Sequence, residues 1–159
     1  MTNLFRLKYT NPDFILFDDT RSVILLKDKR EGRQYVLNNS SRQKNCAYRV
    51  DGGIQTANDE KKCDFAISLA DDRLIFVELK GTDKGRAAEQ ILSSITKLVQ
   101  EPKLQNHTIY GRIVLSRDSY PKIKHAVEQK LEKLLRSYNG NLEIKSRKLE
   151  ESIEKLHTK

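Results

Sequence analysis

The 159-residue sequence predicts a single mixed α/β domain built around a central sheet. Segments 65–70 and 74–79 are apolar on both faces of an extended strand, which is typical of a sheet covered on both sides. Segments 83–101 and 121–138 instead carry apolar residues at helical spacing. Further strand-like segments lie before, between and after these two helices. Strands and helices are therefore interspersed along the chain, as in a mixed α/β domain.

The strands are predicted from β-branched and apolar residues between turn signals. Segment 22–37 predicts a β-hairpin, because "SVILLKD" and "RQYVLNN" flank the turn "KREG". Segment 47–56, "AYRVDGGIQT", is strand-like around a glycine pair. Segments 65–70 and 74–80 follow, and strands are also expected at 108–117 and 141–146.

The two helices have recognisable ends. Thr82 or Asp83 can cap the first helix, and Pro102 stops it. Ser119 precedes the second helix, Pro121 lies in its first turn, and "NG" at 139–140 ends it. The apolar stripes comprise Ala87, Ala88, Ile91, Ile95 and Leu98 in the first helix, and Ile123, Val127, Leu131, Leu134 and Tyr138 in the second.

These elements predict one domain over residues 1–146, with a core at about 48–138 and the hairpin at 22–37. Residues 147–159 are expected to be a charged tail that extends a helix or is disordered. The chain lacks a run of about 18 apolar residues, so nothing is expected to span a membrane. The first residues lack the apolar region of a signal peptide.

Composition narrows the function classes. Cys46 and Cys63 are too few for a disulfide framework and are expected to be buried free thiols, which fits the cytoplasm. The net charge of +8 favours a polyanionic partner, although such a charge can also simply solvate a surface. No glycine-rich phosphate loop and no recognisable nucleophilic triad is present.

Three charged residues lie within the apolar segment "KKCDFAISLADDRLIFVELKG", residues 61–81. Glu78 and Lys80 share a strand face because they are two residues apart. If Asp71–Arg73 is a three-residue loop, Asp64 lies opposite Lys80 on that same face. A two-residue loop would instead turn Asp64 to the other face. The convergence of the three side chains therefore depends on the turn.

Two neighbouring carboxylates repel each other, and a bound divalent cation relieves this repulsion. Oxygen ligands without His or Cys favour Mg²⁺ or Mn²⁺ over zinc. A lysine beside them could orient a water molecule or contact a phosphate oxygen, and such a group suits phosphodiester hydrolysis. The alternative is an ion pair at the end of the sheet, in which Lys80 neutralises Glu78 or Asp64.

The arrangement of Asp64, then Glu78-Leu79-Lys80 on a hydrophobic strand pair followed by a helix, resembles the PD-(D/E)xK nuclease superfamily, whose members include restriction endonucleases. The match covers about residues 50–115. The resemblance implies a restriction-endonuclease-like mixed sheet flanked by helices and metal-dependent cleavage of nucleic acid. It also implies that Asp64 and Glu78 bind the metal and that Lys80 is the catalytic lysine. Cys63 stands where the family often has proline.

Two further residues follow from the resemblance. Gln90 lies where some members carry a glutamine that faces the site, although the tyrosine four residues later in the RecB-type pattern is missing. Asp51 could be an additional metal ligand, or simply a turn residue beside its glycines. The residues expected to contact nucleic acid are Lys84, Arg86, Arg117, Lys122 and Lys124, each of which could equally be a solvated surface charge.

The predicted function is therefore a cytoplasmic, Mg²⁺-dependent deoxyribonuclease that is, by analogy alone, a possible homodimer. A catalytically inactive nuclease-fold subunit that binds nucleic acid or assembles a complex remains an alternative. A plain protein-interaction domain, with its second helix docked on a partner, is another. That last alternative requires the apolar stripe of the helix to be exposed.

Overall fold

The computed structural model describes residues 3–28, 32–56, 61–79, 81–117 and 125–156. Its elements are α1 Leu4–Lys8, η1 Pro12–Phe14, β1 Ile15–Asp19, β2 Val23–Lys27, β3 Gln34–Asn38, β4 Asn45–Arg49, β5 Phe65–Ser68, β6 Arg73–Glu78, α2 Lys84–Ile95, η2 Thr96–Gln100, β7 Thr108–Leu115, α3 Ala126–Ser137, β8 Leu142–Ser146, β9 Lys148–Ser152 and η3 Ile153–Lys155. The predicted mixed α/β class is confirmed, since strands and helices alternate within one sheet-centred structure.

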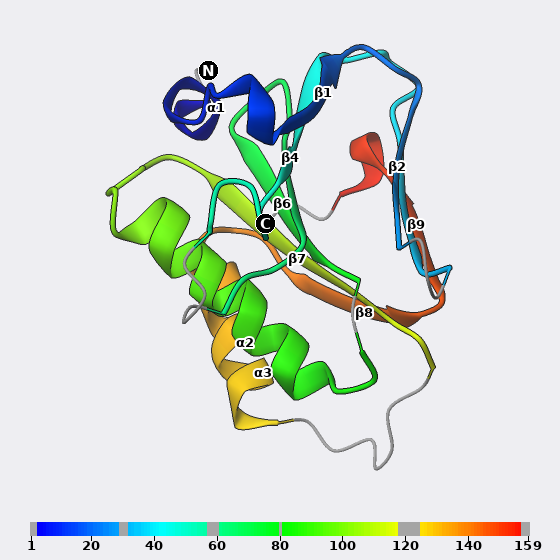
Figure 1. Cartoon of the computed structure of the whole chain (residues 1–159), viewed down its shortest axis with the longest axis vertical. Coiled ribbons are helices and arrows are strands. Elements are labelled where there is room, and N and C mark those ends of the chain that lie inside the picture. Colours follow the sequence, from blue (N-terminus) through cyan, green and yellow to red (C-terminus); the bar gives the residue numbers. More distant parts are fainter. Residues whose placement is uncertain (1–2, 29–31, 57–60, 80, 118–124, 157–159) are drawn as a thin grey trace.

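The central sheet has six strands in the order β1-β4-β5-β6-β7-β8. Strands β1, β4, β5 and β6 pair antiparallel, whereas β6, β7 and β8 pair parallel. Helix α2 connects β6 to β7, and α3 connects β7 to β8, so the two helices form the crossovers that parallel strands require. Figure 1 shows both helices on one side of the sheet.

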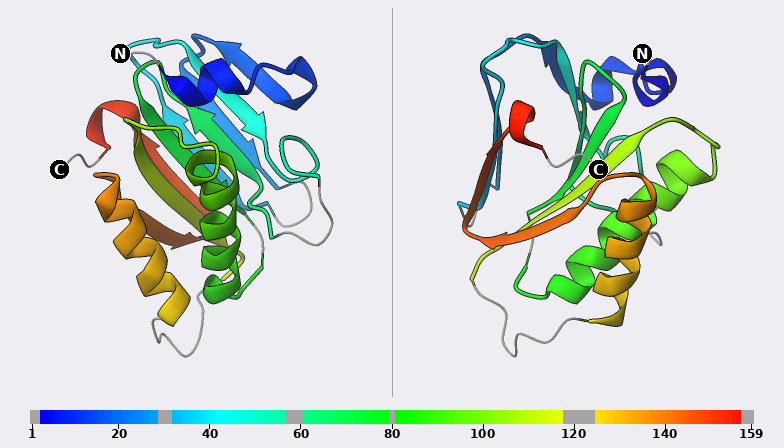
Figure 2. Two further views of the ribbon diagram at one scale, coloured as in Figure 1. Left: turned by 90° about the vertical axis from the view of Figure 1, so that its left-hand side faces the viewer. Right: turned by 180° about the vertical axis from the view of Figure 1, so that it is seen from behind.

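A second sheet covers the opposite face. It has three strands in the order β2-β3-β9, and β9 pairs parallel with β3. Figure 2 shows the resulting three layers of helices, large sheet and small sheet. The predicted hairpin is confirmed as β2 and β3, in which Val23 pairs with Asn38 and Lys27 with Gln34. The hairpin therefore belongs to the covering layer.

Each face of the large sheet has its own apolar core, as the near-continuous apolar strands predict. In β6, Leu74 and Phe76 pack toward the helices, beside Ile91 of α2. Ile75 and Val77 pack toward the second sheet. Glu78 has the strand parity of Leu74 and Phe76, so its side chain lies on the helical side.

Helix α2 begins where the sequence predicts. Asp83 is its N-cap, and the Asp83 side chain accepts a hydrogen bond from the backbone N–H of Arg86 at 3.1 Å. Helix α3, however, begins later than predicted. His125 has extended backbone dihedrals and is the N-cap, so α3 starts at Ala126, whereas Ser119 and Pro121, where the sequence predicts the start, are not among the described residues. Residues 118–124 lie outside the described residues.

The C-terminal segment differs most from expectation. Residues after Arg147 form β9 and η3 instead of a free tail, and the side chains of Leu149, Ile153 and Leu156 are buried in the core between the two sheets. Only one of the five β9 residues is fully buried, so local alternation could not reveal this strand. Among the described residues, no helix has the length and apolar character needed to cross a membrane.

Candidate functional site

The predicted acidic pair lies at the edge of the sheet where the parallel strands β6, β7 and β8 end and helices α2 and α3 begin. Glu78 is the last residue of β6, and Asp64 directly precedes β5. Ligands of open α/β sheets bind preferentially at this edge, because the positive ends of the helix dipoles face it. The pair therefore lies at the edge where open α/β sheets commonly bind their ligands.

The turn between β5 and β6 differs from the predicted one by a single residue. Ser68 pairs with Leu74, and the backbone N–H of Leu69 donates to Arg73 O at 3.0 Å, so the three-residue loop is Ala70–Asp72. Phe65 pairs with Val77 in the same register, and one step further along the two strands Asp64 lies opposite Glu78 instead of opposite Lys80. The loop length remains odd, so Asp64 and Glu78 still share a face, as predicted.

Contacts from distant segments explain the position of this loop. The side chain of Asn3 donates to Asp71 O at 2.8 Å, and the imidazole Nδ1 of His107 lies 2.7 Å from Asp72 O. The carboxylate of Asp71 also accepts the backbone N–H of Arg73 at 3.0 Å, and none of the loop residues Ala70–Asp72 has a positive φ, so this loop does not need the glycine that many such loops use. The register is therefore determined by tertiary contacts as well as by the turn itself.

Asp64 and Glu78 are joined by two reciprocal hydrogen bonds. The backbone N–H of Asp64 donates to Glu78 Oε1 at 3.0 Å, and the backbone N–H of Leu79 donates to Asp64 Oδ2 at 2.9 Å. Glu78 is 0% exposed and Asp64 is half-buried. Each carboxylate is thus held by the backbone of the other strand, in a rigid arrangement that requires no ordering when a ligand binds.

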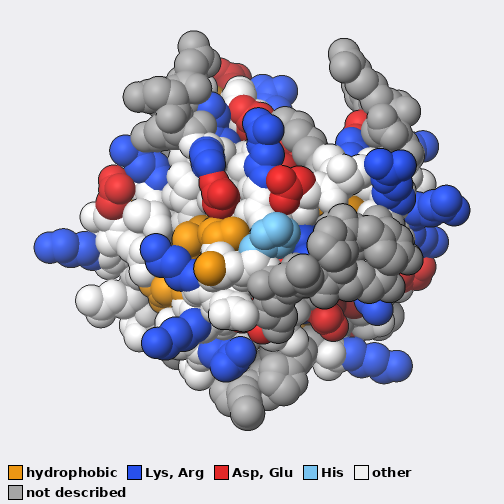
Figure 3. Space-filling model, turned by 90° about the horizontal axis from the view of Figure 1, so that it is seen from below, with side chains coloured by type: hydrophobic (Ala, Val, Ile, Leu, Met, Phe, Trp, Pro, Cys, Tyr) orange, Lys and Arg blue, Asp and Glu red, His pale blue; other side chains and the backbone are white. Residues whose placement is uncertain are grey.

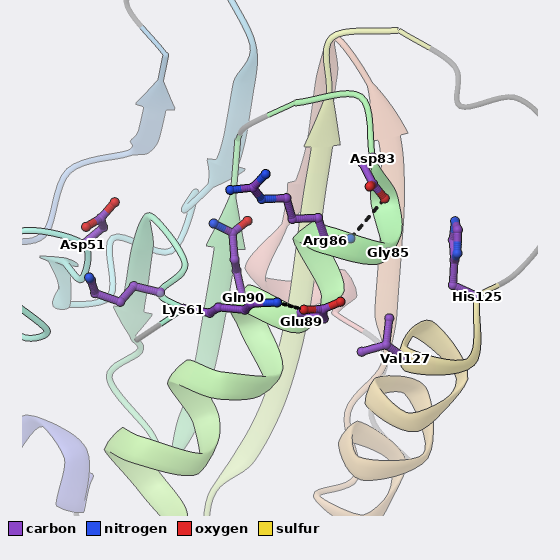
Figure 4. A pocket seen from close by; sticks show the side chains of 10 residues that line it. Asp51, Lys61, Asp83, Gly85, Arg86, Glu89, Gln90, His125 and Val127 are labelled. Atoms are coloured by element: carbon purple, nitrogen blue, oxygen red, sulfur yellow. Dashed lines mark hydrogen bonds and ion pairs between the residues drawn. The ribbon is translucent and has the colours of Figure 1, made fainter. Parts of the chain in front are cut away.

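A pocket of about 580 Å³ lies at the start of α2; its lining includes Lys62, two residues before Asp64, but neither Asp64 nor Glu78. Figure 4 shows Arg86 and Gln90 projecting from successive turns of α2 toward the side on which Asp51 and Lys61 lie, with His125 at the other side. A second hollow of about 390 Å³ shares Arg86 and Gln90 and extends to Gly81. Gln90 therefore lines two hollows at the start of α2, and its role in a catalytic site stays a prediction.

The charges in the larger pocket are balanced. Its basic residues are Lys61, Lys62 and Arg86, and its acidic residues are Asp51, Asp83 and Glu89. The Lys61 ammonium pairs with the Glu89 carboxylate, and Asp83 caps α2. The pocket alone therefore does not account for attraction of a polyanion. Figure 3 views the molecule from the side on which α2 and α3 begin, and shows Lys and Arg side chains spread around it with fewer acidic ones among them.

Asp51 lines the pocket with Gln90, in a tight turn in which the backbone N–H of Gln55 donates to Val50 O. Gly53 is required there, since an added Cβ would lie 2.0 Å from Arg49 O. The described residues include no group of three or more His, Cys, Asp or Glu side chains able to hold a metal ion. A role of Asp51 as an additional ligand therefore stays a prediction.

The predicted basic residues are not equivalent. Lys84 is only 14% exposed, and its ammonium lies 3.6 Å from the buried carboxylate of Glu128, so it supports the contact of α2 with α3 instead of facing solvent. Arg86 and Arg117 are exposed, Arg86 in the pocket and Arg117 just after β7. Lys80, Lys122 and Lys124 lie outside the described residues.

Cys63 stabilises the site without chemistry of its own. Its thiol is buried, and burial raises the pKa of Cys63 well above its usual range, so the thiolate nucleophile is disfavoured. Its backbone N–H donates to Ser94 Oγ at 2.9 Å, and Ser94 Oγ donates to Gln55 Oε1 at 2.7 Å. This buried chain attaches the segment before Asp64 to helix α2 and to the turn that carries Asp51.

Sequence reasoning missed one residue at this edge. The side chain of Arg33 is 7% exposed and reaches from the second sheet to the loop after Glu78. No periodicity or motif singles out this arginine, because its partners are distant in the sequence.

Comparison of the chain with protein-family models, curated proteins and solved structures gave no significant match.

Proposed function

We propose that the protein is a metal-dependent nuclease that hydrolyses phosphodiester bonds in DNA. One observation carries the proposal: two carboxylates, one of them completely buried, lie on opposed strand ends at the sheet edge that both helix N-termini face. Burial of a carboxylate is costly unless it is paired, hydrogen-bonded or bound to a metal. A site for a cation offsets that cost and provides a reason for the pair.

The donor set fits a hard divalent cation. Asp64 and Glu78 offer only oxygen atoms, and Mg²⁺ is commonly bound through one or two carboxylates together with waters and substrate phosphates. Mn²⁺ accepts the same ligands. Two protein carboxylates are therefore sufficient for an ion that the substrate itself helps to hold. When bound, such an ion polarises a phosphoryl oxygen and lowers the pKa of a water molecule.

The residues of the chain would supply the remaining functions. Asp64 and Glu78 would hold the cation at a fixed point, since their reciprocal hydrogen bonds restrain both carboxylates. Lys80, which follows Leu79, would neutralise charge that develops on the phosphate or orient the attacking water. Arg86 and Gln90 line the adjoining pocket and could orient the phosphate.

DNA is the proposed substrate because the chain carries a net charge of +8 and its exposed arginines include Arg86 and Arg117 at this edge. The buried thiols of Cys46 and Cys63 fit action in the cytoplasm. No observation favours the inactive-subunit alternative. The interaction-domain alternative needs an exposed stripe on α3, whereas Leu131 is buried and Val127, Leu134 and Tyr138 are partly buried against the same core.

The test is incubation of the purified protein with plasmid, linear and single-stranded DNA in Mg²⁺, Mn²⁺ or EDTA. Cleavage is expected with either metal, and loss of cleavage is expected with EDTA, Asp64→Asn or Glu78→Gln. Glu101→Gln is the matched control, since this exposed carboxylate pairs only with exposed Lys97 among the described residues. Cleavage that persists equally in Glu78→Gln would show that the activity does not depend on this site, and either that result or absence of cleavage with every substrate would contradict the proposal.

A further inference from the structure

A buried arginine at the turn end of the β2–β3 hairpin links the second sheet to the candidate site. The guanidinium of Arg33 pairs with the Asp28 carboxylate through Nε at 3.0 Å and also through Nη2. Its Nη1 donates to Ser116 Oγ at 2.7 Å and to Gly81 O at 3.4 Å. A single side chain thus binds its own hairpin, the end of β7 and the loop that follows Glu78.

The same loop is bound from a second direction. The backbone N–H of Ser116 donates to Gly81 O at 3.1 Å, so Gly81 O accepts from both Ser116 and Arg33. On the other side of Lys80, the backbone N–H of Leu79 is bound by Asp64. Gly81 has a φ of +78°, a conformation that glycine adopts without strain. The backbone on both sides of the candidate lysine is therefore fixed by named contacts.

The hairpin is itself anchored at this edge. The backbone N–H of Gln34 donates to Arg147 O at 3.0 Å, and the N–H of Arg147 donates to Leu115 O at 2.7 Å. The turn end of the hairpin, the end of β7 and the turn between β8 and β9 consequently meet beside the loop after β6. Arg33 projects from this junction, which makes its guanidinium a rigid support.

The geometry points to Arg33 as a positioning residue of the candidate site, one that holds the loop after Glu78 at Gly81, beside the strand ends that carry Asp64 and Glu78. This inference rests on the proposed nuclease function. It assigns the second sheet a role, because that sheet carries the residue that restrains the catalytic loop. Arg33 acts through Gly81 and Ser116 and is not itself expected to touch the substrate.

The shape of the arginine side chain is what this role requires. A planar guanidinium can bind a carboxylate on one edge while it donates to two other acceptors, whereas a lysine ammonium is a compact charge on a flexible stem. Arg33→Lys therefore keeps the charge beside Asp28 but is expected to lose the contacts to Ser116 and Gly81. Ser116→Ala removes one of these contacts from the other side, at a half-buried position where misfolding is not expected.

Arg112 provides the matched control. It is also a buried arginine, 1% exposed, that pairs with a carboxylate, Glu151, and donates to backbone carbonyls, including Gly111 O. Its contacts connect β7 to β9 and do not include the 79–83 loop. Arg112→Lys should therefore disturb folding to a similar degree without loosening that loop.

The experiment compares wild type, Arg33→Lys, Ser116→Ala and Arg112→Lys below their melting temperatures. The readouts are kcat and KM for Mg²⁺-dependent DNA cleavage, and amide hydrogen exchange of a peptide that covers residues 79–83. Arg33→Lys is expected to lower kcat by about 10- to 100-fold with little change in KM, because small misplacement of a catalytic group has effects of that size. It should also accelerate amide hydrogen exchange in the loop. Ser116→Ala should lower kcat and accelerate exchange as well, but to a smaller extent.

Arg112→Lys should change neither readout. If Arg33→Lys matches Arg112→Lys in kcat and in exchange, the positioning role is refuted and Arg33 is only a structural anchor. If wild type cleaves no DNA, the proposed function has failed, and hydrogen exchange then decides on Arg33 alone. In that case faster exchange in Arg33→Lys than in Arg112→Lys supports the positioning of the loop, and equal exchange refutes it.

Discussion

Replacement of Glu78 by glutamine separates a cation site from a structural ion pair. Glutamine keeps the shape of the side chain and can still accept the backbone N–H of Asp64, the bond that Glu78 Oε1 accepts at 3.0 Å. It removes only the charge. Cleavage should be lost, whereas binding of nucleic acid should survive, because the exposed arginines at the sheet edge are unchanged.

The structure sets the expected effect on stability without metal. Directly opposed side chains of an antiparallel pair lie about 5 Å apart, and two like charges at that distance repel by about 3 kcal/mol at an effective dielectric constant of about 20. Replacement of the charge-assisted hydrogen bond from Asp64 N–H by a neutral one costs about 1 kcal/mol. The metal-free variant should therefore be as stable as wild type or more stable, by up to about 2 kcal/mol.

Mg²⁺ should stabilise the two proteins differently. At a concentration about 100 times its dissociation constant, a ligand of the native state adds about 2.7 kcal/mol, which corresponds to about 5–10 °C in the melting temperature of a domain of this size. Wild type should show a rise of this order. Glu78→Gln retains one carboxylate of the pair, so its affinity for Mg²⁺ and its shift should be much smaller.

Four melting curves, measured by circular dichroism for both proteins with EDTA and with Mg²⁺, provide the assay. Glu101→Gln serves as a charge-matched control and should behave as wild type in both conditions. The reasoning is refuted if metal-free Glu78→Gln melts well below wild type and Mg²⁺ shifts neither curve. That pattern would show that Glu78 is present to neutralise a lysine, as the ion-pair alternative requires.

The other predictions concern binding, the C-terminal strand and pH. Affinity for DNA should fall steeply between about 50 and 200 mM salt in fluorescence anisotropy titrations, because phosphate contacts release counterions; absence of binding at low salt would favour the interaction-domain alternative. Glu151→Ala should destabilise the fold by about 3–5 kcal/mol in urea unfolding, because it leaves buried Arg112 without this carboxylate, and an unchanged midpoint would contradict the role of β9. Burial raises the pKa of Tyr9 to about 12 and places the pKa of Tyr35 and Tyr48 above their usual value near 10. The stabilisation from these protonated tyrosines should therefore be fully present below about pH 10 and be lost as the pH rises through their raised pKa values. Tyrosinate absorbance and loss of the circular dichroism signal should consequently appear together.

Local sequence determined the elements and much of the order. Apolar residues on both strand faces predicted β5 and β6, and the Asp83 cap predicted the start of α2, because both signals depend on neighbouring residues only. The odd loop length placed Asp64 and Glu78 on one face even though the loop is one residue away from its predicted position. Side-chain alternation has a period of two, so this error left the face unchanged.

Contacts between distant segments decided the rest. Strand β9 exists because "KLEES" pairs with β3, and with one fully buried residue it carries no pattern of its own. The Lys84 ammonium is buried beside the Glu128 carboxylate of another helix, and the Arg33 guanidinium donates to Gly81 O from the second sheet. Single residues of this kind have no periodicity or spacing that a sequence can show. Their roles arise only when folding brings their partners together, which is why the residues that hold the candidate site were visible only in the tertiary structure.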